Sequence, residues 1–148
     1  MRTILSIWHS GSKGKSETLR EFGNSLLIAY PSYIPVFPRV AIIPTTGDYR
    51  LVVEINGKRI GIESQGDPNT NLQQRLDDLV VNFKCDIILC STRTRGETVN
   101  AVTNIAQARR YQTIWTSTYQ IPNGSLQSVV NRLKAEHLLE LLQTLNLI

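Results

Sequence analysis

The chain has 148 residues, of which 41% are hydrophobic and 19% are charged, and its formal net charge is +4. Because this is the usual size of one domain, we expect residues 1–148 to form a single domain that buries about two-thirds of its unfolded surface. No apolar stretch approaches the roughly 20 residues that span a bilayer, and no segment resembles a signal peptide. These features predict a cytoplasmic protein that neither spans a membrane nor binds one.

The predicted elements begin with a strand, a loop and a helix. An apolar run at residues 3–8 indicates a strand, and the polar segment H-S-G-S-K-G-K-S follows at residues 9–16. Apolar side chains then recur at helical spacing, which predicts an amphipathic helix that ends by residue 30. Prolines at positions 31, 35 and 38 break the next segment and favour an extended path.

The rest of the chain continues the alternation of strands and helices. Residues 49–63 contain two β-rich segments around Asn56-Gly57, which is a strong signal for an antiparallel hairpin. A helix, a buried strand, a helix, a strand and a leucine-rich helix are then expected at residues 69–83, 85–90, 96–111, 112–119 and 125–148. This order predicts an α/β fold, a three-layer sandwich around a mostly parallel sheet of about five strands with one antiparallel edge strand.

The cysteine and histidine content points away from disulfides and zinc. Cys85 and Cys90 bracket the segment C-D-I-I-L-C, where a strand would hold them about 16 Å apart on opposite faces. That separation excludes a disulfide between them. His9 and His137 are scattered and give no zinc-ligand spacing. We therefore expect both cysteines to be reduced core residues.

The segment at residues 9–16 matches the phosphate-loop pattern G-x-x-x-x-G-K-[ST] at every position except the first, where His9 stands. Gly14 lets the backbone curl around a phosphate, Lys15 reaches its oxygens, and Ser16 can ligate Mg²⁺. A basic, serine-rich turn that merely caps a helix is the simpler alternative. The position between a first strand and an amphipathic helix favours a phosphate site. Its predicted ligand-binding residues are Ser10, Gly11, Ser12, Lys13, Gly14, Lys15, Ser16 and Glu17.

Through this segment the chain resembles the P-loop nucleoside triphosphatase superfamily and, in part, the Ras-like small GTPases. In that family a threonine of a proline-threonine pair before the second strand contacts Mg²⁺, and Pro44, Thr45 and Thr46 stand at this place here. The third strand of the family ends in an acidic residue and D-x-x-G, to which E-S-Q-G at residues 63–66 is similar. The resemblance implies a P-loop NTPase-like fold and Mg²⁺ held by Ser16, Thr46 and Glu63.

The predicted catalytic residues are Lys15, Asp67, Arg93 and Arg95. Asp67 stands where many of these GTPases orient water with a glutamine, and Gln65 is the alternative for that role. Arg93 and Arg95 follow a buried strand, so they are expected on the ligand side of the sheet. There they can clamp phosphate oxygens or act as an arginine finger. The alternative is a pair of solvent-exposed loop arginines, and their alternation allows only one to point inward.

The base-recognition motif of the Ras-like proteins, N-K-x-D, does not occur, so ATP is expected rather than GTP. Tyr119 or an arginine is a candidate to stack on the base. The sequence predicts a Mg²⁺-dependent nucleoside triphosphate hydrolase or switch. A small-molecule or nucleotide kinase and a non-catalytic nucleotide-binding regulatory module are the alternatives. The final helix has enough leucines both for the core and for contact with a protein partner. A nucleic-acid partner is possible, but the basic residues are dispersed and form no basic run that would support it.

Overall fold

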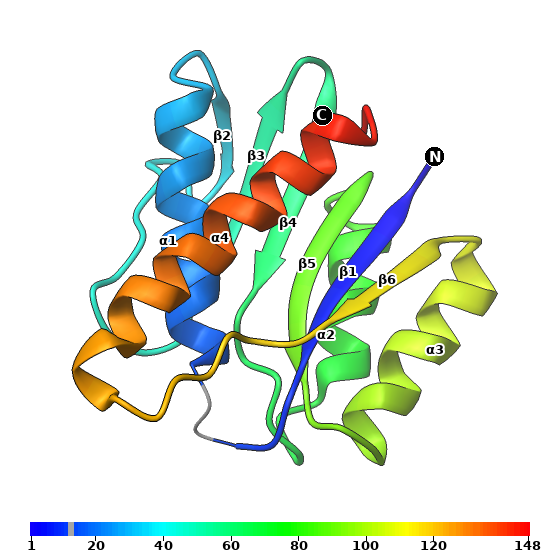
Figure 1. Cartoon of the computed structure of the whole chain (residues 1–148). Coiled ribbons are helices and arrows are strands. Elements are labelled where there is room, and N and C mark those ends of the chain that lie inside the picture. The colour runs from blue at the N-terminus through cyan, green and yellow to red at the C-terminus, as the bar shows by residue number, and fades with distance from the viewer. Residues whose placement is uncertain (12–13) are drawn as a thin grey trace.

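The computed structural model describes residues 1–11 and 14–148, and within these ranges it has an α/β fold with a six-stranded sheet and four α-helices (Figure 1). The strands are β1 (Thr3–Trp8), β2 (Ile34–Phe37), β3 (Arg50–Ile55), β4 (Lys58–Glu63), β5 (Ile87–Thr92) and β6 (Gln112–Thr116). The helices are α1 (Lys15–Ala29), α2 (Leu72–Val81), α3 (Glu97–Arg109) and α4 (Gln127–Thr144), with the short 3₁₀-helix η1 (Gly124–Leu126) before α4.

The strands lie in the order β2-β3-β4-β5-β1-β6. β1 is parallel to β5 and β6 on its two sides, and β4 is parallel to β5. β3 is antiparallel to both of its neighbours, β2 and β4. The described sheet is therefore mixed but mostly parallel, with β3 alone running in the opposite direction.

The prediction of about five strands with an antiparallel strand at the edge was wrong in one respect. The proline-rich segment after α1 is extended, as expected, but it also pairs with β3 as β2, from Ile34 opposite Glu54 to Phe37 opposite Val52. Pro35 lies within β2, where a missing N–H group is tolerated because the outer edge of an edge strand needs no partner. The antiparallel strand β3 is thus internal to the sheet.

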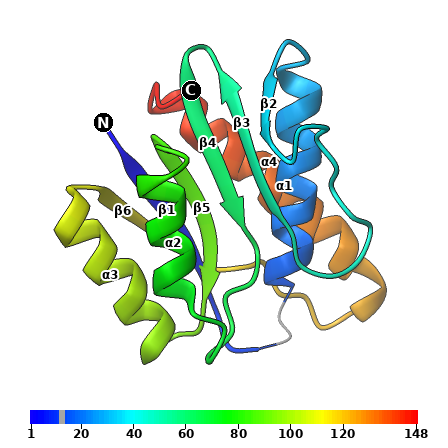
Figure 2. The same ribbon diagram turned by 180° about the vertical axis from the view of Figure 1, so that it is seen from behind.

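Helices cover both faces of the sheet, which gives the expected three layers. α1 and α4 pack together on one face (Figure 1), over a core that includes Leu5, Phe22 and Leu138. α2 and α3 cover the opposite face (Figure 2), where Ile4 and Leu76 belong to a second core. Ile4 and Leu5 are neighbours on β1 and are both fully buried, because successive strand residues point to opposite faces.

Cys85 and Cys90 belong to the core beneath α2 and α3, and both are buried, free thiols. The prediction that they are reduced core residues is confirmed, but the expectation of opposite faces was wrong, because Cys85 precedes β5 and both lie in the same core. Among the described residues, no helix combines the length and apolar character needed to cross a membrane.

The arrangement of the sheet decides which loops meet. The carboxyl ends of β1, β4, β5 and β6 open at one edge, so the segments that follow them gather there. β5 lies between β1 and β4. The segment after β1 therefore adjoins the segment after β5, whereas Glu63 ends a strand one position further away.

Candidate functional site

The site begins where the segment after β1 turns into α1. Gly14 has a left-handed backbone, with φ of 77°, and it caps the helix by accepting a hydrogen bond from Thr18 N at 2.9 Å. A Cβ atom at this position would lie 2.8 Å from Asn131 Oδ1, so both conformation and space require glycine. The first turn of α1 has backbone N–H groups without partners inside the helix, which is a favourable place for an anion.

Lys15 is 6% exposed, and its ammonium group is held by main-chain oxygens. Nζ donates to His9 O at 2.9 Å and to Thr92 O at 2.8 Å, and so joins the segment after β1 to the end of β5. Burial lowers the pKa of Lys15, and the positive charge of Arg93 adds to this effect, whereas the negative charge of Asp67 opposes it. The ammonium group thus sits in a partly dehydrated place, and no carboxylate of residues 1–11 or 14–148 is bonded to it, so an anionic ligand would stabilise its charge.

A cavity of about 320 Å³ opens beside Lys15. It is bounded by the first turn of α1, the segment before β3, the segment after β4 and the end of β5. Its lining residues are Gly14, Lys15, Ser16, Glu17, Arg20, Asp48, Ser64, Gly66, Asp67 and Ser91. The structure therefore brings five of the predicted site residues together, namely Gly14, Lys15, Ser16, Glu17 and Asp67.

The predicted ligand-binding residues before Gly14 are only partly described. Ser12 and Lys13 lie outside the described residues. The exposed Ser10 forms a hydrogen bond of 3.1 Å between its Oγ and His9 Nδ1. Gly11 packs under Arg93, since a Cβ there would lie 2.9 Å from the guanidinium carbon. Neither Ser10 nor Gly11 lines the cavity.

Asp48 is a residue of the site that sequence reasoning missed. Ser16 Oγ donates to Asp48 Oδ1 at 2.9 Å, and Ser64 Oγ donates to the same oxygen at 3.1 Å. Tyr49 N in turn donates to Ser64 Oγ at 2.8 Å, which fixes the serine. A hydroxyl and a carboxylate thus lie side by side next to Lys15, and these are oxygen ligands that suit Mg²⁺.

Glu63 is in a different environment from the one that a metal ligand needs. Its carboxylate is 1% exposed and accepts from Arg75 Nη1 at 2.6 Å and from Arg50 Nη2 at 3.3 Å. It does not line the cavity, and two guanidinium groups already compensate its charge. The structure gives Glu63 the role of holding α2 against β3 and β4.

Thr46, the other predicted metal ligand, is exposed and does not line the cavity. Within residues 1–11 and 14–148, no three His, Cys, Asp or Glu side chains are grouped as a metal site. A metal at the cavity would therefore rely on Ser16, Asp48 and oxygen atoms of the ligand or of water.

The two predicted loop arginines differ in their positions. Arg93 Nε pairs with Asp67 Oδ1 at 3.1 Å, and its backbone N donates to Thr98 Oγ1 at 2.9 Å. Arg95 is exposed and makes no hydrogen bond or ion pair with the rest of the described chain. Arg93 thus lies between Gly11 and the cavity residue Asp67, but neither Arg93 nor Arg95 lines the cavity.

A buried polar contact links α4 to the start of α1, and the sequence carried no signal for it. Asn131 is fully buried and its Nδ2 donates to Glu17 Oε2 at 2.9 Å. Gln127 Nε2 donates to Asn131 Oδ1 at 2.9 Å and also to Tyr119 O at 2.8 Å. Tyr119, the candidate for base stacking, lies outside the cavity lining and bonds through its hydroxyl to His137.

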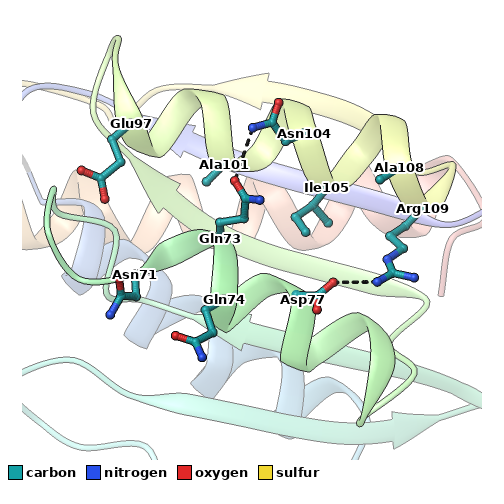
Figure 3. A pocket seen from close by; sticks show the side chains of 10 residues that line it. All are labelled: Asn71, Gln73, Gln74, Asp77, Glu97, Ala101, Asn104, Ile105, Ala108 and Arg109. Carbon is teal, nitrogen blue, oxygen red and sulfur yellow. Dashed lines mark hydrogen bonds and ion pairs between the residues drawn. The ribbon is translucent and has the colours of Figure 1, made fainter.

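A second cavity, of about 660 Å³, lies between α2 and α3 (Figure 3). Carboxamide side chains such as Gln73 and Asn104 line much of it, and Arg109 pairs with Asp77 at its end. None of the predicted site residues lines it.

Comparison of the chain with protein-family models, with curated proteins and with solved structures finds no match. The geometry of the described residues is therefore the basis for a functional proposal.

Proposed function

We propose that the cavity beside Lys15 binds the phosphates of a nucleoside triphosphate together with Mg²⁺, and that the protein hydrolyses the nucleotide or uses it as a switch. The observation that carries this proposal is the buried ammonium of Lys15, held by His9 O and Thr92 O at the start of α1. Burying a cation without a bonded carboxylate costs free energy unless an anionic ligand compensates its charge.

The placement of this lysine supports a P-loop NTPase-like fold. The phosphate segment follows β1, which lies inside the sheet between β5 and β6, and Gly14 has the left-handed backbone that lets the chain curl into α1. A bound phosphate would accept from the unpaired N–H groups of the first turn of α1 and from Lys15 Nζ.

Ser16 and Asp48 fit a magnesium ion better than Glu63 or Thr46 does. Their oxygens are already 2.9 Å apart beside the cavity, and Mg²⁺ usually binds through few protein oxygens, phosphate oxygens and water. When bound, the ion would neutralise charge on the phosphates during transfer to water. We therefore propose Ser16 and Asp48 as the residues that hold it.

Asp67 and Arg93 are the proposed residues for the chemical step. Asp67 lines the cavity, where its carboxylate can orient a water molecule, and Arg93 is held next to it. If the Arg93 side chain releases Asp67, its guanidinium would pair with phosphate oxygens of the bound nucleotide. It would then stabilise the negative charge that moves onto the leaving group.

A non-catalytic nucleotide-binding module is the second candidate. The ion pairs of Glu63 favour it, because they occupy the acidic residue that the family resemblance assigned to the metal. A kinase stays an untested prediction, and so does the preference for ATP.

A thermal-unfolding panel with ATP, GTP, ADP and pyrophosphate, each with and without Mg²⁺, tests nucleotide binding. A ligand at about 100 times its Kd should stabilise the folded chain by about 2.7 kcal/mol. We expect stabilisation by triphosphates with Mg²⁺, followed by phosphate release in a turnover assay. Binding without turnover would favour the non-catalytic module, and no stabilisation by any of these ligands would refute nucleotide binding.

A further inference from the structure

The amino-terminal edge of the parallel strands carries a row of cations, at the opposite end of the sheet from Lys15. Arg2 directly precedes β1, Lys84 and Arg110 lie just before β5 and β6, and Lys58 is the first residue of β4. These four strands are adjacent, in the order β4-β5-β1-β6. Each of them therefore begins at a basic side chain, although the four residues are far apart in the sequence.

Three of these cations share a cavity of about 460 Å³. Arg2, Lys84 and Arg110 line it together with Arg109, and the remaining lining residues are Val80, Val81 and Ala108. Within the described chain no carboxylate lines this cavity. Positive charge thus lies on several sides of the cavity, and of its four described lining cations only Arg109 has an ion-pair partner, Asp77.

The nearby acidic groups are already engaged. Asp77 pairs with Arg109 at 3.0 Å, as Figure 3 shows from the side of the neighbouring cavity. Asp86 accepts from Arg59 N, and Glu54 pairs with the Arg59 side chain. The exposed Lys84 and Arg110 side chains have no ion pair among the described residues. Their charges are therefore available to a ligand.

The backbone at Lys84 and Arg110 gives a second reason to expect a function. Both residues are left-handed, with φ of 54° and 59°, and Arg110 caps the end of α3. Glycine fits this conformation with the least strain and is the usual residue after a helix. Two long cationic side chains thus stand at positions where their own backbone preference is unfavourable.

Arg2 is fixed at the same edge. Its Nη2 donates to Arg109 O at 2.6 Å, and its guanidinium lies 4.8 Å from the centre of the Tyr111 ring. This leaves an ordered guanidinium beside the two unpaired cations, and guanidinium groups bind phosphate oxygens well.

From this row we infer that the amino-terminal edge of the sheet binds the phosphodiester backbone of a nucleic acid. Three strand spacings of roughly 4.8 Å separate β4 from β6, so the row extends over roughly 14 Å. One strand of a duplex presents a phosphate about every 3.4 Å along its axis, so several phosphates fit along this edge. A single phosphate would use only part of the row.

A membrane surface is less well matched to this edge. Insertion into a bilayer interface requires apolar side chains next to the cations. Val81 is 46% exposed, but Val80 is buried in the core. The inferred site is independent of the nucleotide cavity, and the two can be tested separately.

The test is fluorescence anisotropy with a labelled duplex DNA oligonucleotide of 20 base pairs, using the full chain and a Lys84→Gly/Arg110→Gly variant. Glycine relieves the left-handed backbone, so the variant should unfold at the same temperature or higher. Its Kd for the oligonucleotide should rise at least about tenfold, and the slope of log Kd against log salt should fall by about 1.8, or about 0.9 for each lost phosphate contact. If the glycine pair fails to fold, Lys84→Asn/Arg110→Asn takes its place.

Controls separate this edge from general charge and from the nucleotide cavity. Arg39→Gln/Arg132→Gln removes two exposed charges elsewhere and should bind the oligonucleotide nearly as well as the original chain. Lys15→Ala should also keep oligonucleotide binding. An equal loss in either control would overturn the inference. So would an unchanged Kd in the glycine variant, no binding by the original chain, or binding only to phosphatidylserine vesicles or inorganic phosphate.

Discussion

Asp48 and Glu63 are two carboxylates whose environments assign them different roles. Asp48 accepts from Ser16 at the cavity, whereas Glu63 is buried between Arg50 and Arg75. Asp48→Asn should therefore raise the Kd for ATP with Mg²⁺ by about tenfold or more and leave metal-free binding nearly unchanged. Glu63→Gln should instead lower the free energy of unfolding by about 2 kcal/mol, because it weakens charged hydrogen bonds from Arg50 and Arg75.

Calorimetric titration with Mg²⁺ and with EDTA, combined with urea unfolding, measures both effects. If Glu63→Gln lost Mg²⁺-dependent affinity at unchanged stability, the metal would belong to Glu63, as the family resemblance implied.

Arg93 and Arg95 form a matched pair for testing the chemical step. Arg93 is held beside Asp67 and Gly11, whereas Arg95 is exposed and unpaired within the described residues. If Arg93 stabilises the transition state, Arg93→Ala should lower kcat by roughly 100-fold with little change in nucleotide Kd. Arg95→Ala should retain kcat within about twofold, as expected for an exposed side chain without a partner. Steady-state phosphate release measures both variants, and equal effects would remove the distinction between them.

The two buried thiols predict how stability changes in alkali. Burial raises the pKa of both Cys85 and Cys90 from 9.0 to about 12. The unfolded chain therefore loses these protons before the native chain does, so their contribution to stability is complete below pH 9.0 and is lost as the pH rises to about 12. Urea unfolding between pH 8 and 11 should show this decline, and a Cys85→Ala/Cys90→Ala variant should show a shallower one.

The phosphate-loop pattern could identify site residues only within its own short segment, residues 9–16. Gly14, Lys15, Ser16 and Glu17 line the cavity because they are contiguous at a helix start. Asp48 and Asn131 reach the same place from distant parts of the chain. A single sequence carries no record of such contacts, so these two residues could not have been predicted.

The connection between β4 and β5 depends on a close approach of two backbone segments. Gly66 lies in this connection, directly against the end of β5. A Cβ there would lie 1.8 Å from Ser91 O, in the strand β5. Gly66→Ala should lower the free energy of unfolding by about 3 kcal/mol or more.

Gly124 provides the control for this substitution, since a Cβ there meets nothing within 4 Å. Gly124→Ala should change stability by less than about 0.5 kcal/mol. Urea unfolding of the two variants measures the difference. Equal stabilities would show that the segment after β4 shifts to make room.

Element order was predictable, but element neighbours were not. Alternating strands and helices and the Asn56-Gly57 hairpin follow from hydrophobic period and turn chemistry, and the structure has them. In the sheet, β5 lies between β1 and β4. The spacing of the strands along the chain does not determine which strands pair, so this order could not be predicted. The family resemblance assigned Glu63 to the same metal as Ser16, whereas β5 separates the strand that ends at Glu63 from β1.

For the whole molecule, the sheet separates two positively charged regions. Lys15 and Arg93 lie near the carboxyl ends of the strands, and Arg2, Lys84 and Arg110 lie near the amino ends. The sequence shows the net charge of +4 but no basic run, because the cations of the second region come from separate segments. The two regions give the chain separate places for a nucleotide and for a polyanion.

Calorimetric titration of ATP with Mg²⁺ into the original chain, Lys15→Ala and Lys58→Ala measures directly whether the cavity beside Lys15 binds phosphate. Lys58 matches the charge but lies at the opposite end of the sheet, at the start of β4. We predict measurable binding by the original chain and by Lys58→Ala, and a Kd raised at least about 100-fold, or about 2.8 kcal/mol, by Lys15→Ala. Unchanged affinity in a folded Lys15→Ala variant would contradict the assignment of the cavity beside Lys15 as a phosphate site.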